Sequence, residues 1–471
     1  MKTKKYKNIK SIKKTKNTKK TKKTKQTKKN VKKFLNLKHN ALKVNVPELI
    51  TVNNHKVILI KTNNKLLSVE SFIFNGFIHE NKNTLGINHL LEHVLVDSYK
   101  NCNKNCSQYL TKSGIKYNAS TNDNIVKYYT FGLNDDLNKM LDYIVSITVK
   151  PTFDKHIIDK EKQAVYNELL AHMDEPEYKI VNRINELLYL YYGLQRSYDY
   201  AKQLKNLKCF NYNTLMQYYR ENYLHNNTLF VVSGNFNKKE VINRFKTFPQ
   251  EKRSLNTNQK PRLNTTNIDY KNINCFSNTK KFEFLKNKKL KGTQINLCFP
   301  LNLTYNSKNH ILLDFSVNVL HYYLMQMLRE KKNLVYGATL SVDTNICGSV
   351  INLFINTKNE NVMIVFKSIK QIINHYKKNK ISNNELIPFK KKYKIDYYNK
   401  HLTPSVLANM YGKQYIYNHF ISSNILHPHN IYNIIQNING KNIQNCINEY
   451  FDFNNFVCVY SNNDKPVKFN F

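Results

Sequence analysis

The sequence of 471 residues has no Trp, only 11 Gly and 10 Pro, and no apolar run near the roughly 20 residues that a membrane span requires. These absences predict a protein without a transmembrane segment. The first 33 residues also lack the apolar core of a secretory leader. We therefore expect an intracellular protein, cytoplasmic by default, with mitochondrial and virion-associated locations left open.

Cysteine is sparse as well, with eight residues scattered along the chain. Dispersed cysteines in a long chain without a leader fit a reducing compartment better than a disulfide scaffold. Cys102 and Cys106 have a spacing that two zinc ligands can have, but no second close Cys or His pair complements them. We interpret both as free thiols in a loop rather than as half of a zinc site.

Acidic residues are absent from residues 1–40, which contain 18 Lys. Their Lys-Thr-Lys repeats have almost no apolar side chains, so this segment is predicted to be a disordered basic tail. Without it, 56 Lys and Arg remain against 32 Asp and Glu, which is +24 of the total charge of +42. That charge is spread uniformly and no recognition motif accompanies it, so we interpret it as compositional bias. Binding of nucleic acid or of an anionic surface through residues 1–40 stays open.

The rest of the chain has ample apolar residues for packed cores, with 41% hydrophobic residues, 33 Tyr and 25 Phe in the whole sequence. Strand-like segments alternate with long helical ones, which is typical of layered domains. In the first half, strands are predicted at Leu49–Ile60, Val69–Phe77, Ile125–Leu133 and Thr228–Val232, and helices at Leu85–Val96, Asp135–Val149, Asp154–Met173, Tyr178–Tyr192 and Tyr212–Tyr223. In the second half, strands are predicted at Gln294–Phe299, Val335–Val342, Ser349–Asn356 and Phe456–Tyr460, and helices at Asn309–Glu330, Glu360–Lys378, Asn383–Lys400 and Ser405–Tyr417.

The similar order of elements in the two halves indicates a duplicated domain. We predict an α+β fold with two similar α/β-layer domains. The expected boundaries are a tail over 1–40, a first domain over 41–250, a polar linker over 251–290 and a second domain over 291–471.

A His-x-x-Glu-His motif lies in the predicted helix Leu85–Val96. His89 and His93 are four residues apart, so both imidazoles project from one face of the helix. A catalytic zinc site uses three protein ligands and leaves one position for water, so two His and a distant carboxylate would suffice. Glu92 is suitably placed to take a proton from the bound water. The alternative is an amphipathic core helix, but burying two His and a Glu there without a partner would be costly.

With this motif, the sequence resembles the inverzincin metallopeptidases of the pitrilysin, insulin-degrading enzyme and mitochondrial processing peptidase type. In that family the third zinc ligand is a Glu on a later helix, and Glu168 follows His93 by 75 residues, at the family spacing. Glu161, seven residues earlier, matches a second family acid and is expected to orient the site. The segment Phe74–Glu80 and Gly86 resemble the family's approach to the zinc helix.

The resemblance also implies substrate contacts in both halves. Asn118 and Ala119 match the family's edge strand, where the substrate backbone is added as a further strand. Arg329 and Tyr336, seven residues apart, match a pair that reaches the substrate from the second domain, with Tyr336 stabilising the oxyanion. Taken without the family, an Arg and a Tyr at this spacing are more often surface and core residues, and Asn118 and Ala119 fit an ordinary turn and strand equally well.

We therefore expect a zinc metalloendopeptidase with one Zn²⁺ per chain, held in the first domain. The second domain has no His-x-x-Glu-His motif and is expected to serve substrate binding. The resemblance implies a clamshell that closes on an extended peptide or unfolded protein, and its short members pair as homodimers or heterodimers. The alternatives are a catalytically silent partner or scaffold subunit, and a virion- or nucleic-acid-associated protein that binds through its basic tail.

Overall fold

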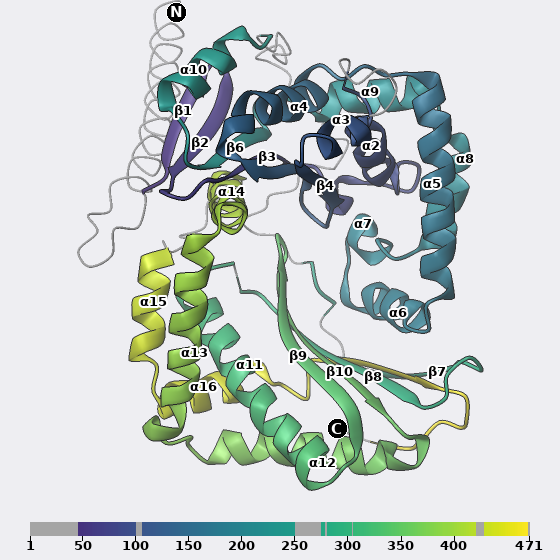
Figure 1. Cartoon of the computed structure of the whole chain (residues 1–471). Helices are drawn as coiled ribbons and strands as arrows, with labels where there is room; N and C mark the ends of the chain where they lie inside the picture. Colours follow the sequence, from purple (N-terminus) through teal and green to yellow (C-terminus); the bar gives the residue numbers. More distant parts are fainter. Residues whose placement is uncertain are drawn as a thin grey trace, which may run out of the picture.

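The computed structural model describes residues 46–99, 106–249, 275–277, 280–303, 305–420 and 428–469 (Figure 1). The predicted tail over 1–40 and most of the predicted linker lie outside these residues, as does Cys102. The described chain forms two layered halves that face each other, each built on one sheet. The predicted α+β class with two α/β-layer domains in a clamshell arrangement is confirmed.

The first half is built on a six-stranded sheet of order β1-β2-β6-β3-β5-β4. All its pairs are antiparallel except β2 and β6. Its strands are β1 (Glu48–Val52), β2 (His55–Lys61), β3 (Leu66–Ile73), β4 (Lys116–Thr121), β5 (Val126–Leu133) and β6 (Thr228–Gly234). Its helices are η1 (Phe77–His79), α2 (Ile87–Val96), α3 (Cys106–Thr111), η3 (Asn134–Asp136), α4 (Leu137–Val149), α5 (Lys155–Asp174), α6 (Tyr178–Leu188), α7 (Tyr192–Gln195), α8 (Tyr200–Cys209), α9 (Tyr212–Asn222) and α10 (Lys238–Thr247).

The second half is built on a five-stranded sheet of order β7-β11-β8-β10-β9, in which only β7 and β11 are parallel. Its strands are β7 (Lys281–Lys286), β8 (Thr293–Leu301), β9 (Val335–Asn345), β10 (Gly348–Thr357) and β11 (Val457–Asn462). Its helices are α11 (Lys308–Met325), η4 (Gln326–Lys331), η5 (Asn359–Asn361), α12 (Val362–Lys378), α13 (Asn383–Leu402), α14 (Pro404–Phe420), α15 (Pro428–Asn437) and α16 (Gly440–Tyr450).

The two sheets repeat one topology. Strands β2, β3, β4, β5 and β6 correspond in chain order and in pairing to β7, β8, β9, β10 and β11, and β1 is an addition to the first half. The corresponding helices follow, so α2 matches α11, and α4, α5 and α6 match α12, α13 and α14. The duplication predicted from the order of elements is therefore present in the fold.

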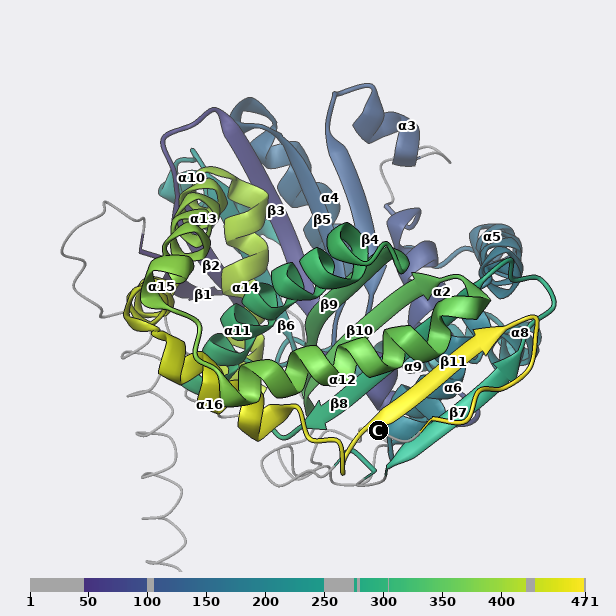
Figure 2. The ribbon, with the colours of Figure 1, turned by 90° about the horizontal axis from the view of Figure 1, so that it is seen from below.

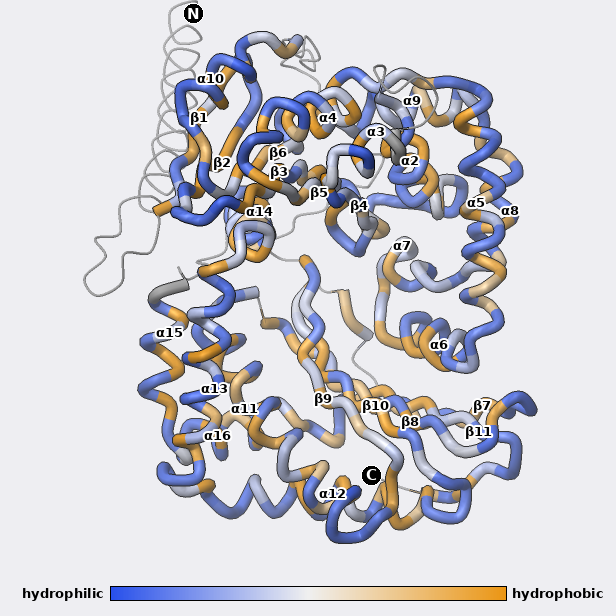
Figure 3. Tube along the Cα trace, viewed as in Figure 1, coloured by the Kyte–Doolittle hydropathy of each residue, from blue (hydrophilic) through white to orange (hydrophobic). Residues whose placement is uncertain are grey.

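The two halves exchange a helix. Helix α14 of the second half packs on β2, β3 and β6 of the first sheet, while α6 of the first half packs on β7, β8 and β11 of the second. A Cβ at Gly412 would come within 2.5 Å of the Phe72 ring, so a glycine allows α14 to approach this closely. One apolar core cluster accordingly combines residues of both halves, and each half also has a core cluster of its own. In Figure 3 the helices around the sheets alternate between hydrophobic and hydrophilic positions.

Three predicted segments differ from the observed elements. The predicted strand Leu49–Ile60 is a hairpin, because Asn53 and Asn54 both adopt positive φ angles and form a tight turn between β1 and β2. The predicted helix Tyr178–Tyr192 ends at Leu188, and α3, α8, α10, α15 and α16 were not predicted. Strand β7 lies within the segment assigned to the linker, since its partner β11 is supplied by the end of the chain and is invisible to local patterning.

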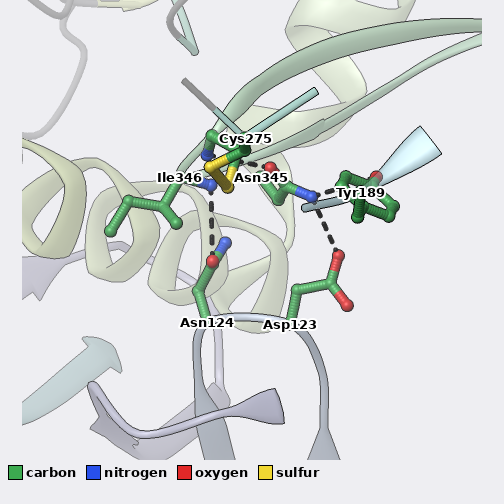
Figure 4. Close-up of a disulfide and its surroundings, with 7 residues drawn as sticks. Asp123, Asn124, Tyr189, Cys275, Asn345 and Ile346 are labelled. Carbon is green, nitrogen blue, oxygen red and sulfur yellow. Dashed lines mark hydrogen bonds between the residues drawn. A yellow bond between two sulfur atoms is a disulfide. The ribbon is translucent and has the colours of Figure 1, made fainter. Parts of the chain in front are cut away.

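The dispersed cysteines were interpreted as fitting a reducing compartment better than a disulfide scaffold, but one pair is bonded, and Cys106, expected in a loop, begins α3. Cys275 and Cys347 form a disulfide with a Cα–Cα distance of 5.4 Å across a sequence separation of 72, which spacing in the sequence does not disclose (Figure 4). Cys209, Cys298, Cys446 and Cys458 are free. No helix in the described part of the chain combines the length and apolarity needed to cross a membrane.

The disulfide lies where the turns of two hairpins meet (Figure 4). In the turn between β9 and β10, Asn345 donates hydrogen bonds to Asp123 and to the Tyr189 hydroxyl, each at 3.1 Å. The Ile346 amide donates to Asn124 at 3.3 Å. Asp123 and Asn124 form the turn between β4 and β5, so the edge hairpins of the two sheets touch at their tips.

Candidate metal centre and catalytic site

The motif helix α2 is held at its N-terminus by Glu80. Gly86, which precedes the helix, has a φ of 90°, a conformation that glycine adopts without a steric penalty. The Glu80 carboxylate accepts hydrogen bonds from the amides of Gly86 at 2.8 Å and Asn88 at 2.9 Å. Burial raises the pKa of Glu80 to about 8, although these hydrogen bonds favour the ionised form. A buried carboxyl group therefore fixes the start of the helix that carries His89 and His93.

Three predicted ligands converge on one point. His89 Nε2 lies 3.5 Å from Glu168 Oε1, and His93 Nε2 lies 3.4 Å from Glu168 Oε2. Donor atoms of all three residues lie within 4.8 Å of one another, which makes this the group of three metal-ligating side chains found among the described residues. The histidines come from α2 and Glu168 from α5, so the packing of these two helices assembles the cluster.

Donor atoms this close together can share one metal ion. Ligand atoms bound to Zn²⁺ at 2.0–2.2 Å lie roughly 3.3–3.5 Å apart when the geometry is tetrahedral. The two distances from Glu168 to the histidines have this length, and they end on different oxygens of the carboxylate. Two imidazoles and one carboxylate are also a donor set that suits zinc and leaves a position open. The residues present therefore fit the metal that the motif predicts.

Glu161 contacts the other nitrogen of the His93 ring. His93 Nδ1 lies 3.2 Å from Glu161 Oε2, so Nε2 is left to point at Glu168. Lys160 bridges Glu161 at 3.0 Å and Asp97 at 2.5 Å, which fixes the position of the carboxylate. Burial lowers the pKa of His93, but hydrogen bonds to Glu161 and Glu168 outweigh it and raise that pKa to about 9. Hydrogen bonds from His89 and His93 hold the pKa of Glu168 well below its ordinary value.

Glu92 is half-buried beside the histidines. Its Oε2 atom accepts a hydrogen bond from the Thr121 hydroxyl at 2.6 Å, which ties α2 to the end of β4. Burial raises the pKa of Glu92, against the Thr121 hydrogen bond and the neighbouring histidines. A carboxylate with a raised pKa next to an open metal position is suited to accept and return a proton.

Strand β4, which carries Asn118 and Ala119, is an edge of the first sheet. The Asn122 amide donates to the Ile125 carbonyl at 3.0 Å. In an antiparallel pair, residues whose amides point toward the partner strand alternate with residues whose amides point away from it. Ala119 therefore directs its amide away from β5. This amide donates to the side chain of Asn118 at 2.8 Å, so the outward-facing group is covered by a neighbouring side chain.

The structure does not bring Arg329 and Tyr336 to the metal cluster. Arg329 is exposed in η4, and Tyr336, the second residue of β9, is 66% exposed. Neither residue lines the cavity beside His89 and Glu168. Their predicted contact with substrate stays a prediction.

A cavity of about 530 Å³ adjoins the cluster, with walls from both halves. Its lining includes His172, Tyr198 and Tyr200 beside the ligands, and Asp343 and Lys413 from the second half. His172 Nε2 lies 3.5 Å from Glu168 Oε1, and the His172 ring stacks on Tyr200. The sequence did not single these residues out. The spacing of four residues from Glu168 to His172 on one helix is the signal that would have found His172.

The duplicated fold thus carries, in its first half, a cluster of two histidines and one glutamate that could hold a metal ion. The family model described as insulinase (peptidase family M16) matches residues 56–199, and the one described as peptidase M16 inactive domain matches residues 210–392. The chain belongs to peptidase family M16, and the resemblance to the pitrilysin type is confirmed.

Two curated relatives are named uncharacterized zinc proteases. YmxG of Bacillus subtilis is 27% identical over 191 residues, which are 39% of this chain and 46% of that protein. The relative from Rickettsia bellii is 24% identical over 172 residues, which are 36% of this chain and 40% of that protein. The matches thus span less than half the length of either relative.

Solved structures share the fold over most of the chain. A protease from Helicobacter pylori has a TM-score of 0.76 at 17% identity, covering 89% of this chain and 99% of that chain. A putative M16-like peptidase from Alicyclobacillus acidocaldarius has a TM-score of 0.71 at 13% identity, covering 90% and 99%. The first half of the periplasmic protease PqqL from Escherichia coli has a TM-score of 0.67 at 15% identity, covering 89% and 92%.

Proposed function

We propose that this protein is a zinc-dependent endopeptidase that hydrolyses peptides in an extended conformation. The observation that carries the proposal is the convergence of His89, His93 and Glu168, whose donor atoms lie within 4.8 Å of one another, with Glu92 beside them. We assign the three as ligands of one Zn²⁺. When bound there, zinc supplies a Lewis acid that polarises a carbonyl and lowers the pKa of a water molecule.

The residues around the metal position have separate roles in the proposed reaction. Glu92 accepts a proton from the attacking water and returns it to the leaving amine, and Thr121 holds its carboxylate in place. Glu161 keeps the His93 ring oriented through Nδ1. Tyr336, which is exposed and does not line the cavity beside the cluster, is assigned to the oxyanion.

The edge strand of the first sheet is the proposed binding site for the substrate backbone. A peptide added beside β4 would receive the hydrogen bond of the Ala119 amide, once the Asn118 side chain has released that amide. Because such pairing uses backbone groups, it selects an extended chain rather than one sequence. Peptides and unfolded proteins are therefore the proposed substrates, and trimming or processing of such chains is the proposed role.

The test compares wild type with Glu92→Gln for zinc content and for peptide cleavage. We expect one zinc per chain in both proteins and a fall in kcat of roughly 10²-fold or more in the variant, because a proton acceptor contributes about 10²- to 10⁴-fold. Glu221→Gln is the matched control, since Glu221 is an exposed carboxylate on α9 that contacts Gln217. A wild type without zinc, or a Glu92→Gln protein that cleaves as fast as wild type, would contradict the proposal.

A further inference from the structure

Helix α13 carries an apolar stripe that nothing in the described chain covers. Ile387 is 59% exposed, Ile395 52%, Tyr398 39% and Leu402 69%. At about 100° per residue these four positions fall within roughly 80° of the helix circumference. Leu386 and Tyr397, on another face of the same helix, are buried against the rest of the second half. The helix therefore packs by one side and exposes large apolar groups on the other.

The corresponding helix of the first half shows that the fold does not require this stripe. Helices α5 and α13 both have 20 residues, and the buried Ile158 and Leu169 of α5 match Leu386 and Tyr397. In that alignment the four stripe positions correspond to residues 159, 167, 170 and 174 of α5. Three of these are the exposed polar residues Asp159, Asn167 and Asp174. The apolar stripe is thus specific to the second half.

The stripe does not line the cavity beside the metal cluster. In the same alignment Glu168 matches Asp396, which lies roughly 100–180° around the helix from the four apolar residues. No residue of α13 lines the cavity beside the cluster. The stripe is therefore an outer surface and is separate from the proposed catalytic site.

Lysines lie within the stripe and along one of its edges. Lys391 lies within it, Lys394 borders it, and Lys392 is also exposed, whereas Asp396 lies on another side of the helix. A helix with an apolar stripe bordered by lysines fits the interface of an anionic bilayer, where apolar groups enter the headgroup boundary and lysines meet acidic lipids. Each lysine near such a surface strengthens binding by roughly fivefold.

We propose that the outer face of α13, formed by Ile387, Lys391, Lys394, Ile395, Tyr398 and Leu402, docks on an anionic lipid surface. A nucleic acid offers phosphates for the lysines but no apolar layer for the stripe. A symmetric contact with a second copy would bring the lysines of one chain against the same lysines of the other. A bilayer rich in acidic lipids offers an apolar layer for the stripe and acidic headgroups for the lysines.

The start of the described chain strengthens this inference. Strand β1 lies on the same side of the molecule as α13 in both Figure 1 and Figure 2. Residues 1–40, with 18 Lys and no acidic residue, precede it in the sequence. Peripheral binding usually needs two signals, such as an apolar element and a polybasic segment, and this chain supplies both.

The experiment measures sedimentation of the full chain with vesicles of phosphatidylcholine containing about 30% phosphatidylserine, and with vesicles of phosphatidylcholine alone. Wild type is expected to bind only the acidic vesicles. Ile387→Ser with Leu402→Ser should weaken this binding at least tenfold, both in the full chain and in a chain lacking residues 1–40. Lys391→Glu with Lys394→Glu should weaken it similarly. The control is Tyr166→Ser with Leu170→Ser, which removes exposed apolar groups of α5 and should leave binding unchanged.

Three outcomes would overturn the proposal. One is a wild type that does not bind acidic vesicles. Another is vesicle binding that the α13 variants leave intact and that disappears when residues 1–40 are deleted, which would assign it to the tail alone. The last is a wild-type dimer that Ile387→Ser with Leu402→Ser dissociates without a change in vesicle binding, which would assign the stripe to a second copy. Thermal unfolding of each variant checks that exposed substitutions leave the fold intact.

Discussion

His93 is held from both sides of its ring, by Glu161 at Nδ1 and by Glu168 at Nε2. Replacing Glu161 with Gln keeps the shape and removes the charge that orients the imidazole and raises its basicity. We expect zinc affinity to fall by about 10- to 100-fold, as for other carboxylates that support a metal-bound histidine. Competition with a chromophoric chelator measures this affinity.

The control for Glu161→Gln is Glu221→Gln, whose carboxylate lies on α9 and contacts Gln217. It should bind zinc as wild type does. Equal affinity in wild type and Glu161→Gln would remove Glu161 from the proposed site.

The sequence predicts residues of this site where a spacing rule exists. His89 and His93 follow from helical periodicity, and Glu161 and Glu168 from the family spacing. Thr121 and Lys160 were not predicted as site residues, because their contacts with Glu92 and Glu161 depend on how β4, α2 and α5 pack. Side-chain partners of this kind are set by tertiary structure and have no local signal.

At the scale of elements, edge strand β4 yields a prediction about substrate binding. Ala119→Pro removes the outward amide while leaving the ladder to β5 intact, since proline is tolerated where the N–H faces away from the sheet. We expect kcat/KM for peptides to fall about tenfold, mainly through KM, with zinc content unchanged. Asn118→Ala is the companion variant, because it releases the same amide and should not raise KM unless the Asn118 side chain itself contacts substrate.

The N-terminus of α2 yields a prediction about pH. The folded pKa of Glu80, about 8, lies above its ordinary value of 4.5, so the unfolded chain loses this proton first as the pH rises. The contribution of Glu80 to stability is therefore full below pH 4.5 and is lost as the pH approaches 8. Relative to Glu80→Gln, wild type should lose on the order of a few kcal/mol across this range.

Denaturant unfolding of wild type and Glu80→Gln at pH 5 and at pH 8 measures this difference. A free-energy gap between the two proteins that stays constant across the two pH values would show that Glu80 is ionised in the folded protein. Hydrogen bonds from Gly86 and Asn88 would then dominate over burial.

Element boundaries were predicted best where periodicity is long. The predicted helices Asp154–Met173 and Asn383–Lys400 match α5 and α13 closely. The hairpin of β1 and β2 was missed because Asn53 and Asn54, residues that tolerate the positive φ angles of a tight turn, were taken as part of one strand. Strand β7 was missed because its partner in the sheet is β11, more than 170 residues later in the chain.

At the scale of the whole molecule, the duplication was visible in the sequence but the exchange of α6 and α14 was not. The disulfide between Cys275 and Cys347 and the contact of Asn345 with Asp123 were equally hidden. Each of these features joins segments far apart in the sequence, so no local pattern discloses it.

The exchanged helices predict that neither half is stable alone. Without the second half, the first sheet loses α14 and exposes the apolar face that includes Ile58, Phe72 and Val231; without the first, the second sheet loses α6. Fragments 41–250 and 275–471 should therefore each bind a hydrophobic dye and melt without cooperativity when expressed alone. Expressed together, they should copurify and recover a cooperative transition, because α14 and α6 return to their partner sheets.

The control is the full chain cut by a protease within residues 251–274, which should keep its cooperative transition. A cooperative transition of fragment 41–250 by itself, at a temperature near that of the full chain, would show that α14 contributes little to the first half.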